Sequence, residues 1–177
     1  MTSTSTTPTA TGHKETHEGR DYVVFTRTFR APIADVWAAV TESDRLARWI
    51  GTWEGDPAEG HVAFQMRYEG DEVPPEKFTI DVCEPPHRLE ITTSMPYDGE
   101  NPETWHLRLQ LTADGGVTTL RFAQDVPEPE MATSVGPGWD YYLDRMVVAE
   151  AGGDPGTLDF DDYFPRLSEH YRAEFGA

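Results

Sequence analysis

Six histidines are the first candidates for chemistry, because neutral imidazole is a common metal ligand. His13 and His17 are spaced i, i+4, but both lie in a segment that we expect to be disordered. His61, His87 and His106 fall near the beginnings of separate predicted strands. No HxxxH, HExxH or CxxC group occurs in the part expected to fold. The sequence therefore predicts no metal site, and we expect no cofactor.

Nucleophilic side chains are equally sparse. The single cysteine, Cys83, has outward parity on its predicted strand and no histidine beside it in the sequence, which argues against a catalytic thiol. No serine lies in a nucleophile-elbow motif. Asp and Glu occur throughout the chain without an acid–base constellation. The residues alone therefore leave the catalytic residues unassigned.

Arg27 is the most unusual polar residue. It shares parity with Val23, Phe25 and Phe29 on the predicted strand Asp21–Arg30, so its guanidinium should face inward. An isolated buried charge is costly, which leaves three interpretations. We favour a structural ion pair with a helix carboxylate over an anchor for a ligand carboxylate or enolate, or a bulge that turns the side chain outward. Thr93 and Gln124 also have inward parity and could donate hydrogen bonds.

The charge balance limits the partners. The 177 residues include 32 Asp and Glu against 14 Lys and Arg, a formal net charge of -18. Such a surface repels nucleic acid and anionic lipid, and no run of Lys or Arg offsets it. The length fits one domain. With one cysteine and no apolar run approaching about 18 residues, we expect no disulfide, no membrane span and a cytoplasmic location.

The N-terminal residues 1–19 are rich in Ser and Thr and have no apolar core that would mark a secretory signal. We therefore expect a disordered tail there. After the first strand, Ala31-Pro32 precedes two short helices, of which the second ends at Gly51. Alternating apolar residues then predict five more strands, in a six-stranded antiparallel sheet. These strands cover residues 62–68, 78–82, 89–95, 105–111 and 120–124.

The segment GPGWDYYLDRM (residues 136–146) predicts a loop leading into a long helix. One apolar stripe with helical spacing supports the helix, and Gly152-Gly153 should end it. We interpret Gly136, Pro137 and Gly138 as a hinge, and we expect Tyr141 to point away from the stripe. The stripe consists of Trp139, Tyr142, Leu143, Met146 and Val147. Asp140, Asp144 and Arg145 should then lie on the flanks or the solvent side.

The C-terminal residues 153–177 form a predicted helical extension. Apolar residues recur there at near-helical spacing from Phe160 to Phe175, with Pro165 in the first turn or splitting the helix. We expect this apolar face to pack back on the domain, with a homodimer contact as the alternative. The protein should accordingly be a monomer, or a homodimer through this extension.

Three segments carry a resemblance to a known family. VVFTRTFRAPIADVWAAVTESDRLARWIG resembles the opening of the SRPBCC superfamily, the START-like and pollen-allergen-like helix-grip domains, and in particular the branch of the activator of heat-shock protein 90 ATPase. FTIDVCEPPHRLEIT resembles the double-proline turn of that branch, and GPGWDYYLDRM its closing helix, with Met146 in place of a leucine. The likeness covers residues 20–151, so we expect a helix-grip domain over 20–152. The matching positions in the opening are Arg27, Phe29, Ala31, Pro32, Val36, Trp37, Leu46 and Trp49.

The resemblance implies a curved antiparallel sheet wrapped around the long C-terminal helix, with a hydrophobic cavity between them. Without it, aromatic stripes at these periods would be interpreted as packed core. The inward faces of the predicted strands and helix supply the candidate cavity lining. These ligand-binding candidates are Arg27, Phe64, Met66, Tyr68, Phe78, Ile91, Met95, Trp105, Phe122, Tyr142 and Met146.

Our first functional hypothesis is a binding module that sequesters an apolar or aromatic small molecule, lipid-like or polyketide-like. The resemblance also allows an enzyme of the polyketide cyclase or dehydratase type, in which Arg27, Tyr68 and Tyr142 would polarise a carbonyl or shuttle a proton. A third possibility is self-protection against a secondary metabolite. A fourth, motivated by the name of the branch alone, is a co-chaperone-like protein-binding domain.

Overall fold

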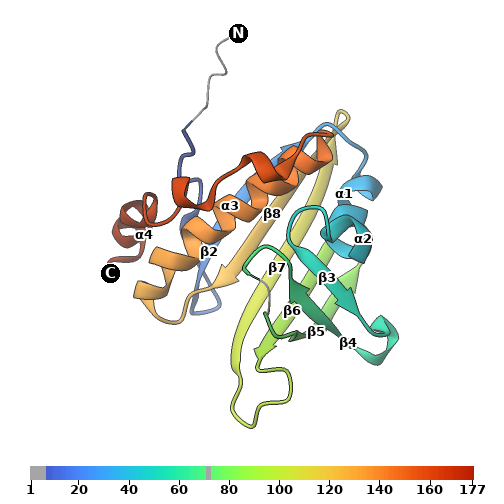
Figure 1. Cartoon of the computed structure of the whole chain (residues 1–177), viewed down its shortest axis with the longest axis horizontal. Helices are drawn as coiled ribbons and strands as arrows, with labels where there is room; N and C mark the ends of the chain where they lie inside the picture. The colour runs from blue at the N-terminus through green and yellow to red at the C-terminus, as the bar shows by residue number, and fades with distance from the viewer. Residues whose placement is uncertain (1–6, 71–72) are drawn as a thin grey trace.

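The computed structural model describes residues 7–70 and 73–177 as a curved antiparallel sheet that packs against one long helix (Figure 1). The predicted α+β helix-grip architecture is confirmed, but the sheet has eight strands and not six. Their order is β1-β2-β8-β7-β6-β5-β4-β3. The strands are β1 (His13–His17), β2 (Arg20–Phe29), β3 (Gly51–Glu54), β4 (His61–Met66), β5 (Glu76–Glu84), β6 (Arg88–Met95), β7 (Glu103–Asp114) and β8 (Val117–Asp125).

The two additional strands form the edges of the sheet. β1 pairs with β2 across Glu18-Gly19, both at positive φ, as a two-residue hairpin loop of type I′ requires. The disordered tail expected over residues 1–19 is therefore wrong for β1, and residues 1–6 lie outside the described residues. β3 is only four residues long, and residues 47–50 separate it from α2. Neither strand shows apolar alternation, because an edge strand can leave most of its side chains in solvent.

Two short helices follow β2, as predicted: α1 (Ile33–Thr41) and α2 (Ser43–Leu46). They lie at one end of the sheet, beside β3 (Figure 1). The indole N–H of Trp49 donates to the carbonyl of Ala39 at 3.0 Å, and that of Trp53 to the carbonyl of Thr41 at 2.8 Å. These bonds fix the helix pair against the chain that follows it.

The long helix α3 (Ala132–Glu150) begins four residues before the GPG segment, so the interpretation of that segment as a hinge is wrong. Pro137 lies inside the helix and cannot donate to the carbonyl of Thr133. The hydroxyl of Ser168 donates to that carbonyl instead, at 2.7 Å. Gly136 allows the Tyr171 ring to approach α3 closely, since a Cβ at this position would lie 2.4 Å from that ring. The segment is thus where the C-terminal residues dock on α3.

The C-terminal extension packs back on the domain, as expected. Its helix α4 (Ser168–Phe175) contacts α3 and β1, and the side chains of Tyr163, Tyr171 and Phe175 are buried. The helix is shorter than predicted, and Pro165 precedes it. Three-residue 3₁₀ turns occupy Pro57–Glu59, Pro129–Met131, Pro155–Thr157 and Phe160–Asp162. The boundary between domain and extension at residue 152, and the oligomeric state, stay predictions.

In the part of the chain that the structure describes, no helix has the length and apolarity needed to cross a bilayer.

Candidate functional site

A cavity of about 480 Å³ lies between the concave face of the sheet and α3. Its wall is predominantly apolar, with the α1–α2 region closing one end through Val40, Leu46, Trp49 and Ile50. The sheet contributes alternate residues of β4 to β8, because only one parity of each strand faces the helix. Phe64 and Phe78 stack with ring centroids 4.5 Å apart and planes 8° from parallel. Sheet and helix therefore do not close into a fully packed core.

Most of the predicted lining residues border this cavity, and three do not. Those at the cavity wall are Phe64, Met66, Phe78, Ile91, Met95, Trp105, Phe122 and Tyr142. Met146 lies outside the lining and is fully buried in the core. Tyr68 follows the end of β4, where strand alternation stops. Its hydroxyl donates to the carbonyl of Ala47 at 2.6 Å, and its ring lies 3.9 Å from the Arg145 guanidinium carbon.

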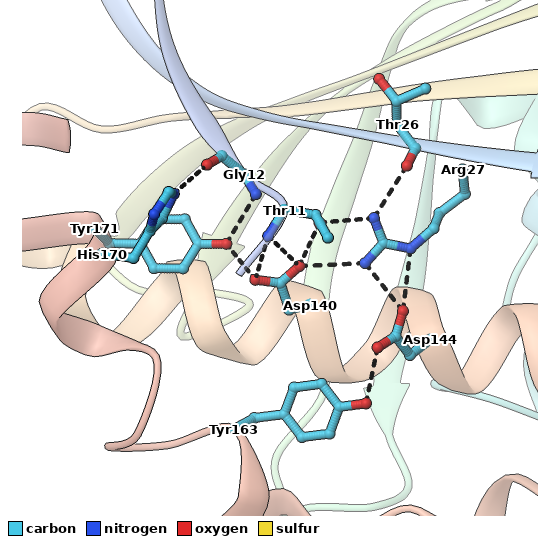
Figure 2. A network of polar contacts seen from close by, with 9 residues as sticks. All are labelled: Thr11, Gly12, Thr26, Arg27, Asp140, Asp144, Tyr163, His170 and Tyr171. Atoms are coloured by element: carbon cyan, nitrogen blue, oxygen red, sulfur yellow. Dashed lines mark hydrogen bonds and ion pairs between the residues drawn. The ribbon is translucent and has the colours of Figure 1, made fainter. Parts of the chain in front are cut away.

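Arg27 is the third residue placed elsewhere. It points to the flank of α3, where it forms ion pairs with Asp140 and Asp144 at 3.2 and 3.1 Å (Figure 2). It also donates to the hydroxyl of Thr11 at 2.8 Å and to the carbonyl of Thr26 at 3.0 Å. Of the three interpretations, the structural ion pair with helix carboxylates is confirmed. The guanidinium is hydrogen-bonded to these partners, and Arg27 does not line the cavity.

Of the two positions expected for Asp140 and Arg145, the flanks or the solvent side of α3, the solvent side is wrong, since both residues are buried. Figure 2 shows why: the N-terminal segment and α4 converge on Asp140. Its carboxylate accepts hydrogen bonds from the backbone and hydroxyl of Thr11 and from the phenol of Tyr171. Burial raises the pKa of Asp140 even though these donors and Arg27 oppose the shift. The group is a structural junction rather than part of the cavity.

Asp144, which was also expected on the flanks or the solvent side, lies on this flank and is partly exposed. Its second carboxylate oxygen accepts from the hydroxyl of Tyr163 at 2.8 Å. Tyr141 also lies on this side, as expected, and packs edge-on against Phe160 and Tyr163 with ring centroids 5.3 and 5.4 Å away. The C-terminal extension therefore covers this side of α3, where Asp140 is buried and Asp144 is partly exposed.

The carboxyl groups of Glu69 and Glu76 lie at the cavity wall and were not predicted from the sequence. The hydroxyl of Tyr142 donates to Glu69 at 3.0 Å, and Glu76 also borders the cavity. Burial, with a smaller contribution from the charge of Glu69, raises the pKa of Glu76. Burial likewise raises the pKa of Tyr142, again reinforced by Glu69. Nothing in the sequence marked these positions, because Glu69 lies beyond β4 and Glu76 has no distinctive neighbour.

Cys83 lines the cavity although its predicted parity was outward. The pairing of β5 with β6 changes register between Ile80 and Val82, so that Ile80 pairs with Ile91 while Cys83 pairs with Leu89. The extra residue, Asp81, reverses the alternation downstream, as a β-bulge does. The side chain is exposed and free. The bulge therefore explains why alternation counted from Phe78 assigns Cys83 to the wrong face.

Gln124 and Thr93 are the buried uncharged polar side chains at the cavity wall. Gln124 accepts a hydrogen bond from the indole N–H of Trp139 at 2.5 Å. Trp139 in turn packs on Phe122, with ring centroids 4.2 Å apart. The first turns of α3 and the strand β8 are thus joined by one polar contact inside an apolar wall.

Among residues 7–70 and 73–177, no three His, Cys, Asp or Glu side chains are grouped so that they could hold a metal ion.

Comparison with known proteins gives a family and a set of similar folds. Residues 30–149 match the family model described as Activator of Hsp90 ATPase homolog 1-like protein. The fold is similar to that of CalU16 from Micromonospora echinospora, with 24% identity, a TM-score of 0.68, and coverage of 94% of this chain and 96% of that one. No curated protein matches the sequence.

Two further structures are similar. A protein encoded by gene BPP1335 of Bordetella parapertussis has 23% identity and a TM-score of 0.67, with coverage of 97% of this chain and 94% of that one. DynU16, described as a protein in the dynemicin biosynthetic locus, has 24% identity and a TM-score of 0.63, with coverage of 76% and 49%. At these identities the likeness establishes the fold alone.

Proposed function

Since the chain belongs to the family of Activator of Hsp90 ATPase homolog 1-like proteins, we propose that it binds and sequesters an apolar or aromatic small molecule, lipid-like or polyketide-like. The observation that carries this proposal is the apolar cavity of about 480 Å³ between sheet and α3. This volume is within the range of roughly 300–1,000 Å³ found for small-molecule sites.

The wall chemistry favours flat, carbon-rich ligands. Phe78, Trp105 and Trp139 present aromatic surfaces to the cavity, and aromatic rings prefer offset-stacked or edge-on contacts with one another. Met66 and Met95 add flexible side chains that can adapt to an irregular ligand. Burial of apolar ligand surface supplies about 25 cal/mol per Å², so a ligand of two to four fused rings gains affinity without any charged contact.

A screen of lipids and polycyclic aromatic compounds tests the proposal. Trp49, Trp53, Trp105 and Trp139 all border the cavity, so a bound ligand should change the tryptophan fluorescence. At a ligand concentration of about 100 Kd the melting temperature should rise by roughly 5 to 10 °C. If no member of a broad set raises it at saturation, the proposal fails.

A matched pair of variants localises the binding. Ile91→Trp places a larger side chain at the cavity wall, whereas Thr112→Trp adds the same group to an exposed position of β7. We expect the first to weaken ligand binding and the second to leave it unchanged. Equal effects would place the ligand somewhere other than the cavity.

An enzyme of the cyclase or dehydratase type is a second candidate, and the carboxyl groups at the cavity favour it. Glu76, with its raised pKa, holds a proton to higher pH than an ordinary glutamate, and Glu69 accepts from the hydroxyl of Tyr142. A general acid and a general base at one cavity could move protons on a carbonyl substrate. Loss of turnover of a poly-β-ketone thioester in both Glu76→Gln and Tyr142→Phe, with binding retained, would support this function. No turnover by the unaltered protein would exclude it for that substrate.

Self-protection against a secondary metabolite is a third candidate, favoured by the similarity to DynU16 from the dynemicin biosynthetic locus. Sequestration in the cavity would lower the free concentration of a toxic product. Deletion of the gene should then increase sensitivity to a metabolite made from neighbouring genes. An absence of biosynthetic genes around it would count against this candidate.

A further inference from the structure

Gln124 is the polar residue on which the inference depends. It lies on β8 with no solvent exposure, and its side chain borders the cavity. The residues opposite it on the two neighbouring strands are Val23 and Leu107, both apolar. The sheet therefore offers its side-chain amide no polar partner.

The contact with Trp139 determines how the amide is oriented. An indole N–H can only donate a hydrogen bond, so the group that faces it at 2.5 Å must be the carbonyl oxygen of Gln124. The alternative assignment, with oxygen and nitrogen exchanged, would bring two donors together. The amide nitrogen is consequently the free end of the side chain.

That nitrogen, Nε2, is buried and has no hydrogen-bond partner among the described residues. Buried amide groups are nearly always hydrogen-bonded, because leaving one unsatisfied forfeits its solvation. An acceptor atom on a molecule bound in the cavity would satisfy this donor.

The charges at the wall restrict the kind of acceptor. The lining includes Glu69 and Glu76, while no Lys, Arg or His is found at the wall in the described part of the chain. An anionic ligand would meet these carboxylates without a compensating cation. A neutral oxygen does not have this disadvantage.

We propose that the ligand is a neutral polycyclic carbonyl compound whose oxygen accepts a hydrogen bond from Nε2 of Gln124. This inference rests on the proposed small-molecule binding and specifies its ligand class. The rings occupy the apolar part of the cavity, and Gln124 sets their orientation.

Pairs of probes that differ only by the carbonyl group test the inference. We would measure Kd for 9-fluorenone against fluorene and for xanthone against xanthene by tryptophan fluorescence. The unaltered protein should bind each ketone about 3- to 10-fold more tightly than the partner that has CH₂ in place of the carbonyl group. In Gln124→Leu the two members of each pair should bind with about equal Kd, or the ketone more weakly, and the partner without the carbonyl group should still bind.

Thr93→Val is the matched control, since it removes the other buried hydroxyl or amide donor of the wall. We expect it to retain the preference for the ketone. If Thr93→Val abolishes the preference and Gln124→Leu does not, the assignment to Gln124 is overturned.

NMR spectra of the unaltered protein test the contact with Gln124 independently of the affinities. The side-chain amide resonances of Gln124 should shift when 9-fluorenone binds and should shift less with fluorene. Equal affinities of both members of each pair would overturn this inference and leave the binding function standing. Failure of all four probes to bind would overturn both.

Discussion

At the scale of single residues, Arg27 shows how much depends on what lies opposite a side chain. Strand parity was enough to place it inward, and the cost of an unpaired buried charge was enough to favour a helix carboxylate as its partner. Asp140 and Asp144 could only be assigned to the flanks or the solvent side of α3, because the helical stripe cannot reveal that residues far along the chain cover its other side. Gln124 was also predicted to face inward. That its amide nitrogen lacks a hydrogen-bond partner among the described residues is evident only from the structure, where Trp139 donates to the amide oxygen.

Removal of the Asp140 carboxylate should be severely destabilising. Asp140→Ala leaves Arg27 buried without one of its two carboxylate partners and deprives Thr11 and Tyr171 of their acceptor. We expect a loss of about 3–5 kcal/mol in the free energy of unfolding, measured by urea denaturation. Asp162→Ala, which breaks an exposed pair with Arg166, should cost less than about 1 kcal/mol. Similar losses in the two variants would refute the role of Asp140.

Glu76 should make stability depend on pH. Its pKa is raised in the folded protein, so the folded state retains a proton that the unfolded chain releases. The associated stability is present below the ordinary glutamate pKa and is lost as pH rises through the raised value. Glu76→Gln should therefore raise the melting temperature by about 1–3 °C near neutral pH, with the gain shrinking toward pH 4. Glu59→Gln, at an exposed position, controls for net charge. A gain that persists unchanged to pH 4 would contradict the interpretation.

At the scale of elements, prediction succeeded where one face of a segment is buried and the other is not. The alternation in β4 to β8 and the stripe of α3 are of this kind, and they predicted most of the apolar residues that border the cavity, but not that Met146 and Tyr68 lie outside it. The edge strands β1 and β3 lack such a pattern, and the bulge at Asp81 reverses parity without a local signal. Pro137 was taken as a boundary because prolines disrupt helices, whereas a hydroxyl from α4 compensates for it here.

Two neighbouring glycines of α3 should respond oppositely to alanine. A Cβ on Gly136 would meet the Tyr171 ring, while a Cβ on Gly138 would meet nothing within 4 Å. Gly136→Ala should therefore destabilise the protein by about 1–3 kcal/mol through overpacking. Gly138→Ala should stabilise it by roughly 0.5–1 kcal/mol, because alanine is the better helix former. Thermal unfolding of the two variants measures both effects, and a shift of the same sign in both would contradict the docking of α4 at Gly136.

At the scale of the whole molecule, the N-terminal segment around Thr11 and Gly12 is in contact with α3 and with the C-terminal helix α4. Residues from the N-terminal segment, β2, α3 and α4 meet at Asp140 (Figure 2), which does not line the cavity. The cavity wall comes mainly from the concave face of the sheet, the first turns of α3 and the α1–α2 region, and Phe160 of the C-terminal extension also borders it.

The junction at Asp140 also determines how slowly one short backbone segment exchanges its protons with water. The amide of Thr11 donates to Asp140, 129 positions along the chain, and that of Gly12 to Tyr171, 159 positions along. Both amides can open only when these distant partners separate, so deuterium should enter them at nearly the rate of global unfolding. Hydrogen-exchange mass spectrometry should find residues 11 and 12 as protected as the centre of the sheet. Full labelling within seconds would mean that the two ends part far more often than the rest of the fold.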